Sequence, residues 1–366
     1  IIIQNGNMCE LDLPLKFAQK LYNEFAIRHP NAFYLRTRQR GMQNWDGKIH
    51  YITKTGQFKI GLLPKVYDMC IEMGIKPKVV DMRQPLPKVS KVVTNIGKYK
   101  LRPEQEKAVK AVINNKIRNT PFHIGVLDYT VNAGKTLIMS SLYLSYKKQL
   151  KTLLITNDSD WLNQAREEFK QYLPEEDITF VQGKVLNWSN FTIGMVQSIS
   201  RNMRFYQKEL SQIDMVLVDE ADQGGSKQYQ NVITRLFNTR IRIGLSGTIY
   251  MSKLAKDKVK NMNLECFFGK VLAEFKLKDS IKKGYSTKTV VKMVPGKPWY
   301  GNWESDCISY KEIYDDSITN SYTAWLMAYS RLRWNINQGR YPALVVCKHI
   351  APVSYTHLRA HETLRH

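Results

Sequence analysis

A Gly-Lys-Thr triplet, Gly134 to Thr136, lies between an apolar run and a segment with helical spacing. At such a junction several backbone N–H groups can face the phosphates of a nucleotide. A lysine there reaches the β and γ oxygens, and the threonine hydroxyl binds Mg²⁺. Lys135 and Thr136 fit these two roles. The backbone around the phosphates is predicted to come from Asn132, Ala133 and Gly134, so the loop predicts binding of a nucleoside triphosphate.

An acidic pair follows a second apolar run, residues 215–218. Asp219 ends that predicted strand, where its carboxylate can hold the same Mg²⁺ through water. Glu220 beside it can orient or deprotonate the attacking water. The positive charges of Lys135 and the metal offset the negative charge that develops on the transferred phosphoryl group. Lys135, Asp219 and Glu220 are therefore the predicted catalytic residues, with ATP and Mg²⁺ as the cofactors.

The phosphate loop departs from the usual pattern at its first position. Tyr129 stands where glycine is usual, and a lone Gly-Lys-Thr triplet also occurs at ordinary helix N-caps, where the lysine is solvated. The flanking segments favour the phosphate loop. Residues 122–127 form a plausible buried strand, and residues 136–150 have an apolar helical face that ends in two lysines.

Short apolar strands alternate with helical patterns across residues 96–275. The strands are predicted at residues 152–156, 178–181, 191–197, 215–218 and 241–246. Such alternation predicts an α/β fold in which a parallel sheet is covered by helices on both faces, with ligands at the carboxyl ends of the strands. Both nucleotide motifs fall at such strand ends.

Residues 1–95 are predicted to form a small basic α+β domain. A helix is expected over Leu15–His29, and a strand pair over Lys48–Tyr51 and Gln57–Ile60. A segment rich in Pro and Lys, residues 76–100, is expected to link this domain to the nucleotide-binding α/β unit that follows.

A second α/β lobe is expected over residues 276–352. Its first strand is predicted at residues 289–294, a long helix at residues 318–337, and a further strand at residues 343–347. Residues 353–366 continue no pattern and are expected to be a non-native tail. Their three histidines are therefore not interpreted as a metal site. The first three residues resemble the middle of a strand, so the record is expected to begin inside its gene.

The composition favours a soluble nucleic-acid-binding protein. The 366 residues carry a formal net charge of +23, which attracts polyanions, and the 43% apolar content is enough for two or three domains with their own cores. Nucleic acid is expected rather than a membrane, since no apolar run approaches the length of a bilayer span. Five scattered cysteines without a Cys-x-x-Cys pair favour a reducing cytosol, so a cytoplasmic location is expected.

The first 100 residues are especially basic, with 17 Lys and Arg against 7 Asp and Glu. The predicted nucleic-acid contacts in this region are Arg36, Arg38, Arg40, Trp45 and Lys48. Basic residues interleaved with aromatic ones suit phosphate contact combined with base stacking. The alternative is that the aromatic side chains form the core of the small domain.

With these motifs in order, the chain resembles the superfamily 2 helicases, and within them the phage UvsW-like branch of DNA helicases. The resemblance covers nearly all of residues 1–352 and implies two RecA-like motor lobes, the second one incomplete here. Leu101 to Gln105 (LRPEQ) is similar to the motif that precedes the phosphate loop in this superfamily. The resemblance implies that Gln105 reads the adenine edge and that Arg102 belongs to the same nucleotide site.

Three further motifs are similar to the segments that link the nucleotide to the nucleic-acid track. Residues 153–164 resemble motif Ia, residues 194–198 motif Ib, and residues 244–248 motif III. The residues that the resemblance assigns to nucleic-acid contact or coupling are Thr156, Asn157, Gln164, Gln197, Ser198, Ser246 and Thr248. Ser246 and Thr248 are expected to pass hydrogen bonds between the Asp219-Glu220 pair and the track.

The tetrapeptide Asp-Glu-Ala-Asp at 219–222 is also found in DEAD-box RNA helicases. That family carries Pro-Thr-Arg-Glu-Leu-Ala and Ser-Ala-Thr, whereas this chain has different residues at 156–161 and Ser-Gly-Thr at 246–248. DNA is therefore the expected substrate, with RNA as the alternative. Residues 45–64 resemble the small domain that precedes the motor in UvsW-like proteins, which implies work on branched or forked DNA in recombination, repair or replication.

Two expectations follow from this resemblance. The main one is an ATP-dependent DNA helicase or translocase. The alternative is a motor that moves along duplex DNA as the subunit of a restriction or remodelling complex. Residues 343–350 resemble motif IV, so motifs V and VI are expected to be missing. Because motif VI supplies an arginine finger whose loss costs about 10³–10⁵ in rate, this chain is expected to hydrolyse almost no ATP.

Overall fold

The computed structural model describes residues 1–38, 41–146, 149–183, 185–249, 257–288 and 322–339. The chain divides into two compact units, residues 1–288 and 289–366. Helix α13 (Tyr322–Asn337) is the described element of the second unit and matches the predicted long helix. Arg40, the predicted strands at 289–294 and 343–347, and the tail at 353–366 lie outside the described residues.

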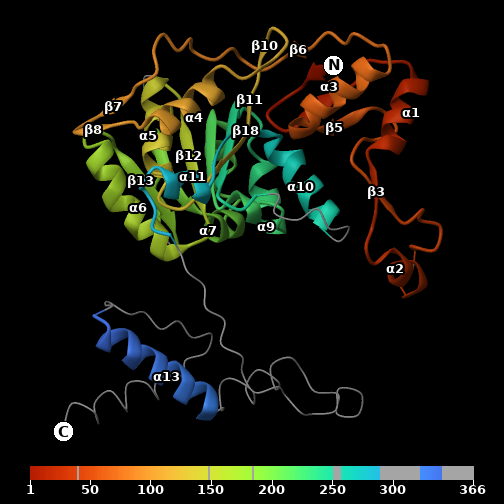
Figure 1. Cartoon of the computed structure of the whole chain (residues 1–366). Coiled ribbons are helices and arrows are strands. Elements are labelled where there is room, and N and C mark those ends of the chain that lie inside the picture. The colour runs from red at the N-terminus through yellow and green to blue at the C-terminus, as the bar shows by residue number, and fades with distance from the viewer. Residues whose placement is uncertain (39–40, 147–148, 184, 250–256, 289–321, 340–366) are drawn as a thin grey trace. The chain divides into compact units, whose positions relative to one another are not determined.

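An eight-stranded sheet forms the centre of residues 1–288 (Figure 1). Its strands lie in the order β14-β13-β15-β12-β16-β17-β11-β18, and all neighbours are parallel except β13 and β14. The bounds are β11 (His123–Tyr129), β12 (Thr152–Thr156), β13 (Ile178–Gln182), β14 (Val185–Leu186), β15 (Phe191–Met195), β16 (Met215–Asp219), β17 (Ile241–Ser246) and β18 (Val271–Phe275). The α/β parallel-sheet prediction is confirmed.

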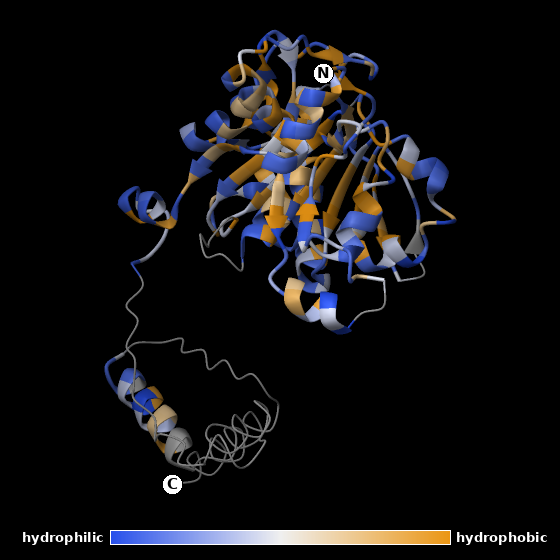
Figure 2. Ribbon diagram, turned by 90° about the vertical axis from the view of Figure 1, so that its right-hand side faces the viewer, coloured by the Kyte–Doolittle hydropathy of each residue, from blue (hydrophilic) through white to orange (hydrophobic). Residues whose placement is uncertain are grey.

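Helices cover both faces of this sheet because the strands are apolar on both sides. One apolar core joins the sheet to α4 (Pro103–Ile113), α5 (Lys135–Ser145) and α6 (Ser159–Tyr172). The other core joins it to α7 (Val196–Arg201), α8 (Gln207–Ser211), α9 (Lys227–Ile233) and α10 (Lys258–Phe268). Figure 2 shows the apolar strands enclosed between these layers. Such burial on both faces is typical of parallel sheets.

Two predicted elements run past the ends that the structure gives them. The predicted strand at 191–197 ends at Met195, since α7 begins at Val196. The predicted helix at 136–150 begins at Lys135 and ends at Ser145. None of the described helices combines the length and the apolar character that a bilayer span requires.

A second, smaller sheet lies at the N-terminus, in the order β5-β2-β1-β6. Its elements are β1 (Ile2–Ile3), β2 (Met8–Glu10), α1 (Leu15–Glu24), β5 (Gln57–Lys59), the 3-10 helix η1 (Ile60–Leu62), α3 (Leu63–Glu72) and β6 (Val80–Asp81). Two short ribbons follow, β7 (Asn95–Ile96) with β8 (Tyr99–Lys100), and β9 (Lys116–Ile117) with β10 (Thr120–Pro121). The predicted linker at 76–100 therefore contains three short strands.

The N-terminal layer packs directly on the motor. Its residues share one apolar core with α9 and α10. Gly61 permits the closest approach, because a Cβ there would lie 2.1 Å from the carbonyl oxygen of Glu265. The guanidinium of Arg242, a fully buried residue of β17, donates hydrogen bonds to the Gly6 carbonyl (2.6 Å) and to Asn7 Oδ1 (2.7 Å).

A projecting segment, residues 26–50, is named the arm here. It consists of β3 (Ala26–Arg28), α2 (Ala32–Arg38) and β4 (Lys48–His50), with β3 and β4 paired antiparallel. The predicted helix to His29 was wrong, since α1 ends at Glu24 and the chain turns into β3. Both strands of the predicted pair are present, and a single antiparallel bridge, Ile52 with Phe58, joins the two segments. Their ladders, however, are made with other partners, since β4 pairs with β3 and β5 pairs with β2.

Candidate nucleotide site and nucleic-acid track

The carboxyl ends of three neighbouring strands carry the nucleotide motifs. The loop after β11 holds Gly-Lys-Thr, β16 ends at Asp219, and β17 lies between them and ends at Ser246. Gly134 caps α5 with a φ of 74°, in the left-handed region that favours glycine. A Cβ at Gly134 would lie 2.3 Å from Gln105 Nε2, so the glycine also makes room for Gln105.

Lys135 faces the acidic pair. Its Nζ lies 3.6 Å from Asp219 Oδ1 and 3.8 Å from Glu220 Oε1. Burial raises the pKa of Asp219 above its ordinary value although Lys135 acts in the opposite direction, and burial likewise raises the pKa of Glu220. Glu220 has a φ of 51°, an uncommon conformation for a residue with a side chain. Strained backbone and perturbed carboxylates together are typical of functional sites.

The donor set fits a magnesium ion bound with a nucleotide. Asp219 Oδ1 is buried and has no hydrogen-bond partner, so it has a free lone pair for a metal-bound water. Thr136 is the second residue of α5, directly after Lys135. Within the described residues no group of three His, Cys, Asp or Glu side chains could hold a metal alone. That is consistent with Mg²⁺, which usually binds through one or two protein groups plus substrate phosphates.

Gln105 and Arg102 hold the phosphate loop from its other side. Gln105 Nε2 donates to the Ala133 carbonyl (2.9 Å), and its Oε1 accepts from the Arg102 N–H (2.8 Å). Arg102 donates to the Asn132 carbonyl (3.3 Å). Both polar atoms of the Gln105 side-chain amide are therefore bonded to the chain. Adenine recognition by Gln105 would require an exchange of these bonds.

Tyr129 is a core residue rather than a loop residue. It ends β11, is fully buried, packs against Phe275 and donates a hydrogen bond of 2.7 Å from its hydroxyl to the Glu104 carbonyl. This explains why the first loop position tolerates a residue other than glycine.

The ring of Tyr285 lies beside Arg102, a neighbour that the sequence motifs did not indicate. The Arg102 guanidinium lies 4.3 Å from the centre of the Tyr285 ring, and Lys283 pairs with Glu104 at 2.7 Å. Lys276 likewise pairs with Asp128. The segment 276–288 therefore packs on the first lobe, although residue 276 was the predicted start of the second.

The motif III serine meets a different carboxylate from the one expected. Ser246 Oγ donates to Asp222 Oδ1 (3.0 Å) and accepts from the Thr248 N–H (3.2 Å). The expected contact was with the Asp219-Glu220 pair. Because Glu220 adopts a left-handed conformation, the chain turns there and brings Asp222, on the 3-10 helix η2 (Ala221–Gln223), toward β17.

Two of the predicted track residues form a chain of hydrogen bonds with Gln223. Gln197 Nε2 donates to the Asn157 carbonyl (3.2 Å), and Asn157 Nδ2 donates to Gln223 Oε1. Gln223 was not predicted, although it directly follows the acidic tetrapeptide. The structure thus brings residues of motifs Ia and Ib next to the end of the acidic tetrapeptide at 219–222.

The other predicted track residues do not join this chain. Thr156 is buried and its hydroxyl accepts from the Asp158 N–H. Ser198 is buried and accepts from the Gly183 N–H (2.9 Å). Gln164 lies exposed on α6, where it donates to Glu168.

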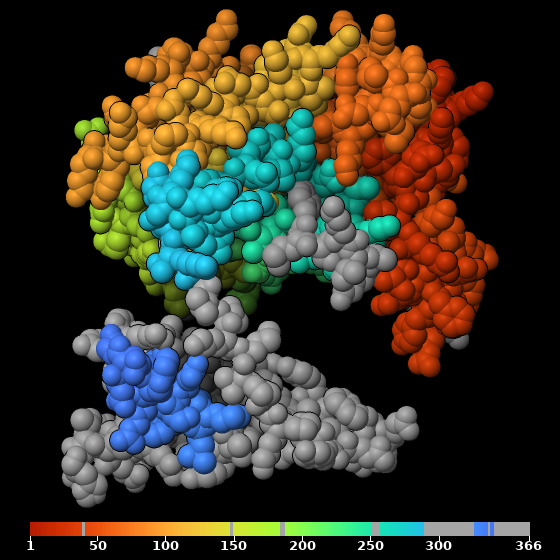
Figure 3. Space-filling view, in the orientation of Figure 1, coloured from red at the N-terminus to blue at the C-terminus, as the bar shows by residue number. Residues whose placement is uncertain are grey.

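The predicted basic contacts of the N-terminal region lie on the arm, which stands out from the surface in the space-filling view (Figure 3). Arg36 and Arg38 are exposed on α2. Trp45 Nε1 donates to the Lys48 carbonyl (2.9 Å), and the Trp45 ring packs edge-on against His29. Trp45 therefore supports the fold of the arm, but it remains partly exposed and is not a core residue, and its contact with nucleic acid stays a prediction. A groove is lined by Pro30 of the arm and by Asp222, Gln223, Gly225, Ser226, Val259, Lys260 and Asn263.

Comparison with known proteins agrees with this arrangement. The family described as "Type III restriction enzyme, res subunit" matches residues 98–251. Among curated proteins, the ATP-dependent DNA helicase uvsW of Enterobacteria phage T4 is 24% identical over 227 residues. The match covers 56% of this chain and 43% of that protein, so the chain spans less than half of this relative.

Two solved structures of the UvsW helicase from bacteriophage T4 share the fold. The first has a TM-score of 0.58 at 20% identity and covers 74% of this chain and 97% of that one. The second has a TM-score of 0.56 at 19% identity and covers 74% of this chain and 55% of that one. By sequence and by fold, the chain is therefore similar to the UvsW helicase of bacteriophage T4, and its eight-stranded lobe has a RecA-like α/β fold.

Proposed function

We propose that this protein is an ATP-dependent DNA helicase or translocase that acts on branched or forked DNA. ATP with Mg²⁺ binds at Lys135, Thr136 and Asp219, and Glu220 orients or deprotonates the attacking water. Gln105 and Arg102 bind the base side of the nucleotide. DNA lies along Asn157, Gln197 and the arm. The proposed division is a basic N-terminal domain at 1–95, a first motor lobe at 96–275 and the start of a second lobe at 276–352.

One observation carries this proposal. The groups that would meet the phosphates and those that would meet the nucleic acid are linked through a single turn, residues 219–223, by one ion pair and two hydrogen bonds. Asp219 faces Lys135 (3.6 Å), Asp222 accepts from Ser246 (3.0 Å), and Gln223 accepts from Asn157. A change at the phosphates can therefore move track residues without passing through the apolar core. Such coupling is what a motor requires and what a simple nucleotide-binding protein does not.

The alternative is a motor that moves along duplex DNA without separating the strands. The match of residues 98–251 to a restriction-enzyme subunit family favours this alternative. Two assays on the complete gene product distinguish the proposals. A helicase displaces an oligonucleotide from a forked duplex, whereas a translocase displaces the third strand of a triplex and leaves the forked duplex paired. Displacement of an RNA strand alone would support an RNA helicase and overturn both DNA proposals.

A further inference from the structure

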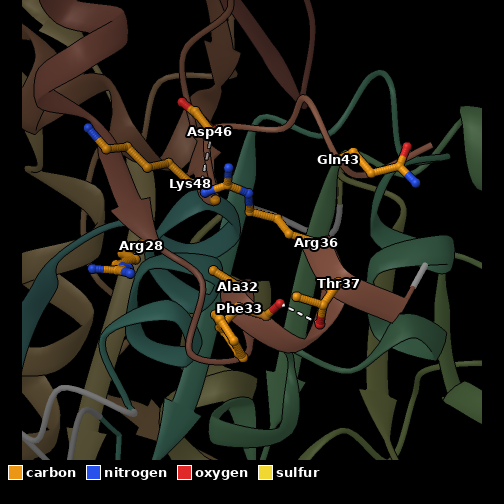
Figure 4. Close-up of a pocket in the computed structure, with 9 residues that line it drawn as sticks. Arg28, Ala32, Phe33, Arg36, Thr37, Gln43, Asp46 and Lys48 are labelled. Carbon is orange, nitrogen blue, oxygen red and sulfur yellow. Dashed lines mark hydrogen bonds between the residues drawn. The ribbon is translucent and has the colours of Figure 1, made fainter. Parts of the chain in front are cut away.

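The arm contains a pocket of about 470 Å³, within the range of small-molecule sites. It is lined by Arg28, Ala32, Phe33, Arg36, Thr37, Gln43, Asp46, Gly47 and Lys48. Figure 4 shows Arg36 reaching from α2 toward the turn that carries Asp46 and Lys48, with Phe33 on the same helix. The pocket is made entirely by the arm and is separate from the nucleotide site.

The charge of this pocket favours an anion. Arg28, Arg36 and Lys48 are exposed, and within the described part of the chain none of them forms an ion pair with a carboxylate. The one carboxylate of the lining, Asp46, accepts hydrogen bonds from the Lys48 N–H (2.9 Å) and from His50 Nε2 (2.7 Å). These two bonds lower the pKa of Asp46, so that it remains ionised and orders the turn. Three cations are left for a ligand.

An aromatic face lies beside these cations. The Phe33 side chain is 80% exposed, which among the large apolar residues of the described chain is equalled by Phe205 alone. Single exposed apolar side chains are common on protein surfaces, so exposure alone indicates little. Phe33, however, lines the same pocket as Arg36, which lies three residues further along α2 and therefore on the same face of the helix. In one pocket, Arg36 can therefore pair with a phosphate and Phe33 can stack on a base, which are the two contacts that a single nucleotide needs.

The arm is held in a defined shape. The His29 N–H donates to the Gly47 carbonyl (2.9 Å), and Ala32, the buried residue of α2, packs against Gly47. The Trp45 indole donates to the Lys48 carbonyl. Pro30, between β3 and α2 of the arm, also lines the groove that contains Asp222 and Gln223. A ligand in the pocket would therefore lie at one end of a path that reaches the motor's coupling turn.

We propose that the arm pocket binds one unpaired nucleotide of DNA at the branch point, with its base on Phe33 and its phosphate held by Arg28, Arg36 and Lys48. A paired base inside a duplex has both faces covered by its neighbours, whereas an unpaired base at a branch point can offer a face to Phe33. This inference rests on the proposed function and adds to it a specific reader of the junction.

The test is DNA binding by residues 1–366, measured by fluorescence anisotropy at fixed salt. The probes are a blunt duplex and the same duplex with an unpaired oligothymidine tail. Stacking of one base is worth about 1–3 kcal/mol, so Phe33→Ala should weaken binding of the tailed duplex by roughly 5- to 100-fold. Binding of the blunt duplex should change less than about 2-fold. Phe33→Trp should restore the tailed affinity, and Phe237→Ala, which removes another exposed phenylalanine, should alter neither.

A second variant tests the phosphate contact. Arg36→Ala should reduce the slope of log affinity against log salt for the tailed duplex by about 0.7, the value for one single-strand phosphate. Equal loss for both probes in Phe33→Ala, or no loss for either, would overturn the junction reader while leaving a DNA-binding motor in place. Absence of binding to both probes by the wild-type chain would overturn the proposed function as well.

Discussion

Ser246 Oγ donates a hydrogen bond of 3.0 Å to Asp222 Oδ1, which ties the end of β17 to the turn that follows β16. The same turn contacts Asn157 through Gln223. Motif III therefore contacts the last residue of the acidic tetrapeptide rather than Asp219 or Glu220. This arrangement separates the proposed chemistry, at Asp219 and Glu220, from the proposed coupling, at Asp222 and Gln223.

Loss of the Ser246 hydroxyl should uncouple hydrolysis from DNA. In the complete gene product, Ser246→Ala should keep basal ATP hydrolysis within about 3-fold and lose most of the stimulation by forked DNA. The reason is that Asp222 then loses its partner on β17 while Lys135, Asp219 and Glu220 stay in place. The measurement is the ratio of rates with and without DNA. Thr234→Ala, which removes a hydroxyl bonded only within α9 and the turn after it, is the control. An unchanged ratio in Ser246→Ala would contradict the coupling role.

Neutralising Asp219 should stabilise the nucleotide-free protein while abolishing hydrolysis. Burial raises the pKa of Asp219, so the folded state binds this proton more tightly than the unfolded state does. The ionised carboxylate therefore costs stability at neutral pH, and that cost disappears as the pH falls through the raised pKa. Asp219→Asn should raise the melting temperature at pH 7 and narrow the difference from wild type at acidic pH.

The control for this prediction is Asp68→Asn, which changes an exposed carboxylate on α3 and should leave the melting temperature unchanged. A lower melting temperature for Asp219→Asn would mean that its ion pair with Lys135 outweighs the burial. The proposed exchange of stability for activity at this position would then be wrong.

The contact between Arg242 and the N-terminal layer should be important for stability. Burial lowers the pKa of Arg242 to about 9. Its two terminal nitrogens donate to the Gly6 carbonyl, to Asn7 Oδ1 and to the Phe267 carbonyl (3.2 Å), whereas its buried Nε has no hydrogen-bond partner. Arg242→Met would leave these three acceptors unpaired in the core, at a cost of about 3–5 kcal/mol in the free energy of unfolding. Urea denaturation measures this.

Arg240→Met offers a comparison, since Arg240 directly precedes β17 and its half-buried side chain pairs with Asp214 and donates to the Gln84 and Pro85 carbonyls. Because Arg240 is less buried than Arg242, its loss should cost less, about 1–2 kcal/mol. Equal losses for the two variants would show that the buried contact with residues 6 and 7 contributes little.

The parts of the fold that the sequence predicted are those defined by local pattern. β12 and β17 match the predicted ranges because each is a fully buried apolar run bounded by polar residues. The arm was mispredicted because its three-residue strands depend on a partner more than twenty residues away. A helical pattern that continues past Glu24 carries no sign of that pairing.

The candidate site shows the same limit. Lys135, Asp219 and Glu220 were predicted because their motifs follow apolar runs and so fall at the carboxyl ends of strands of one parallel sheet. The roles of Asp222 and Gln223 depend on the left-handed turn at Glu220, which the residue types do not indicate. The arm pocket likewise exists only because the pairing of β3 with β4 brings Arg28 beside Lys48.

The most direct test of the account is ATP hydrolysis by the complete gene product, measured without nucleic acid and with duplex DNA, forked DNA and RNA. Lys135→Ala serves as the control that removes the phosphate contact. A motor directed at branched DNA should hydrolyse ATP much faster with forked DNA, less so with plain duplex, and not at all when it carries Lys135→Ala. Stimulation by RNA or by plain duplex alone, or no stimulation at all, would contradict a motor directed at branched DNA.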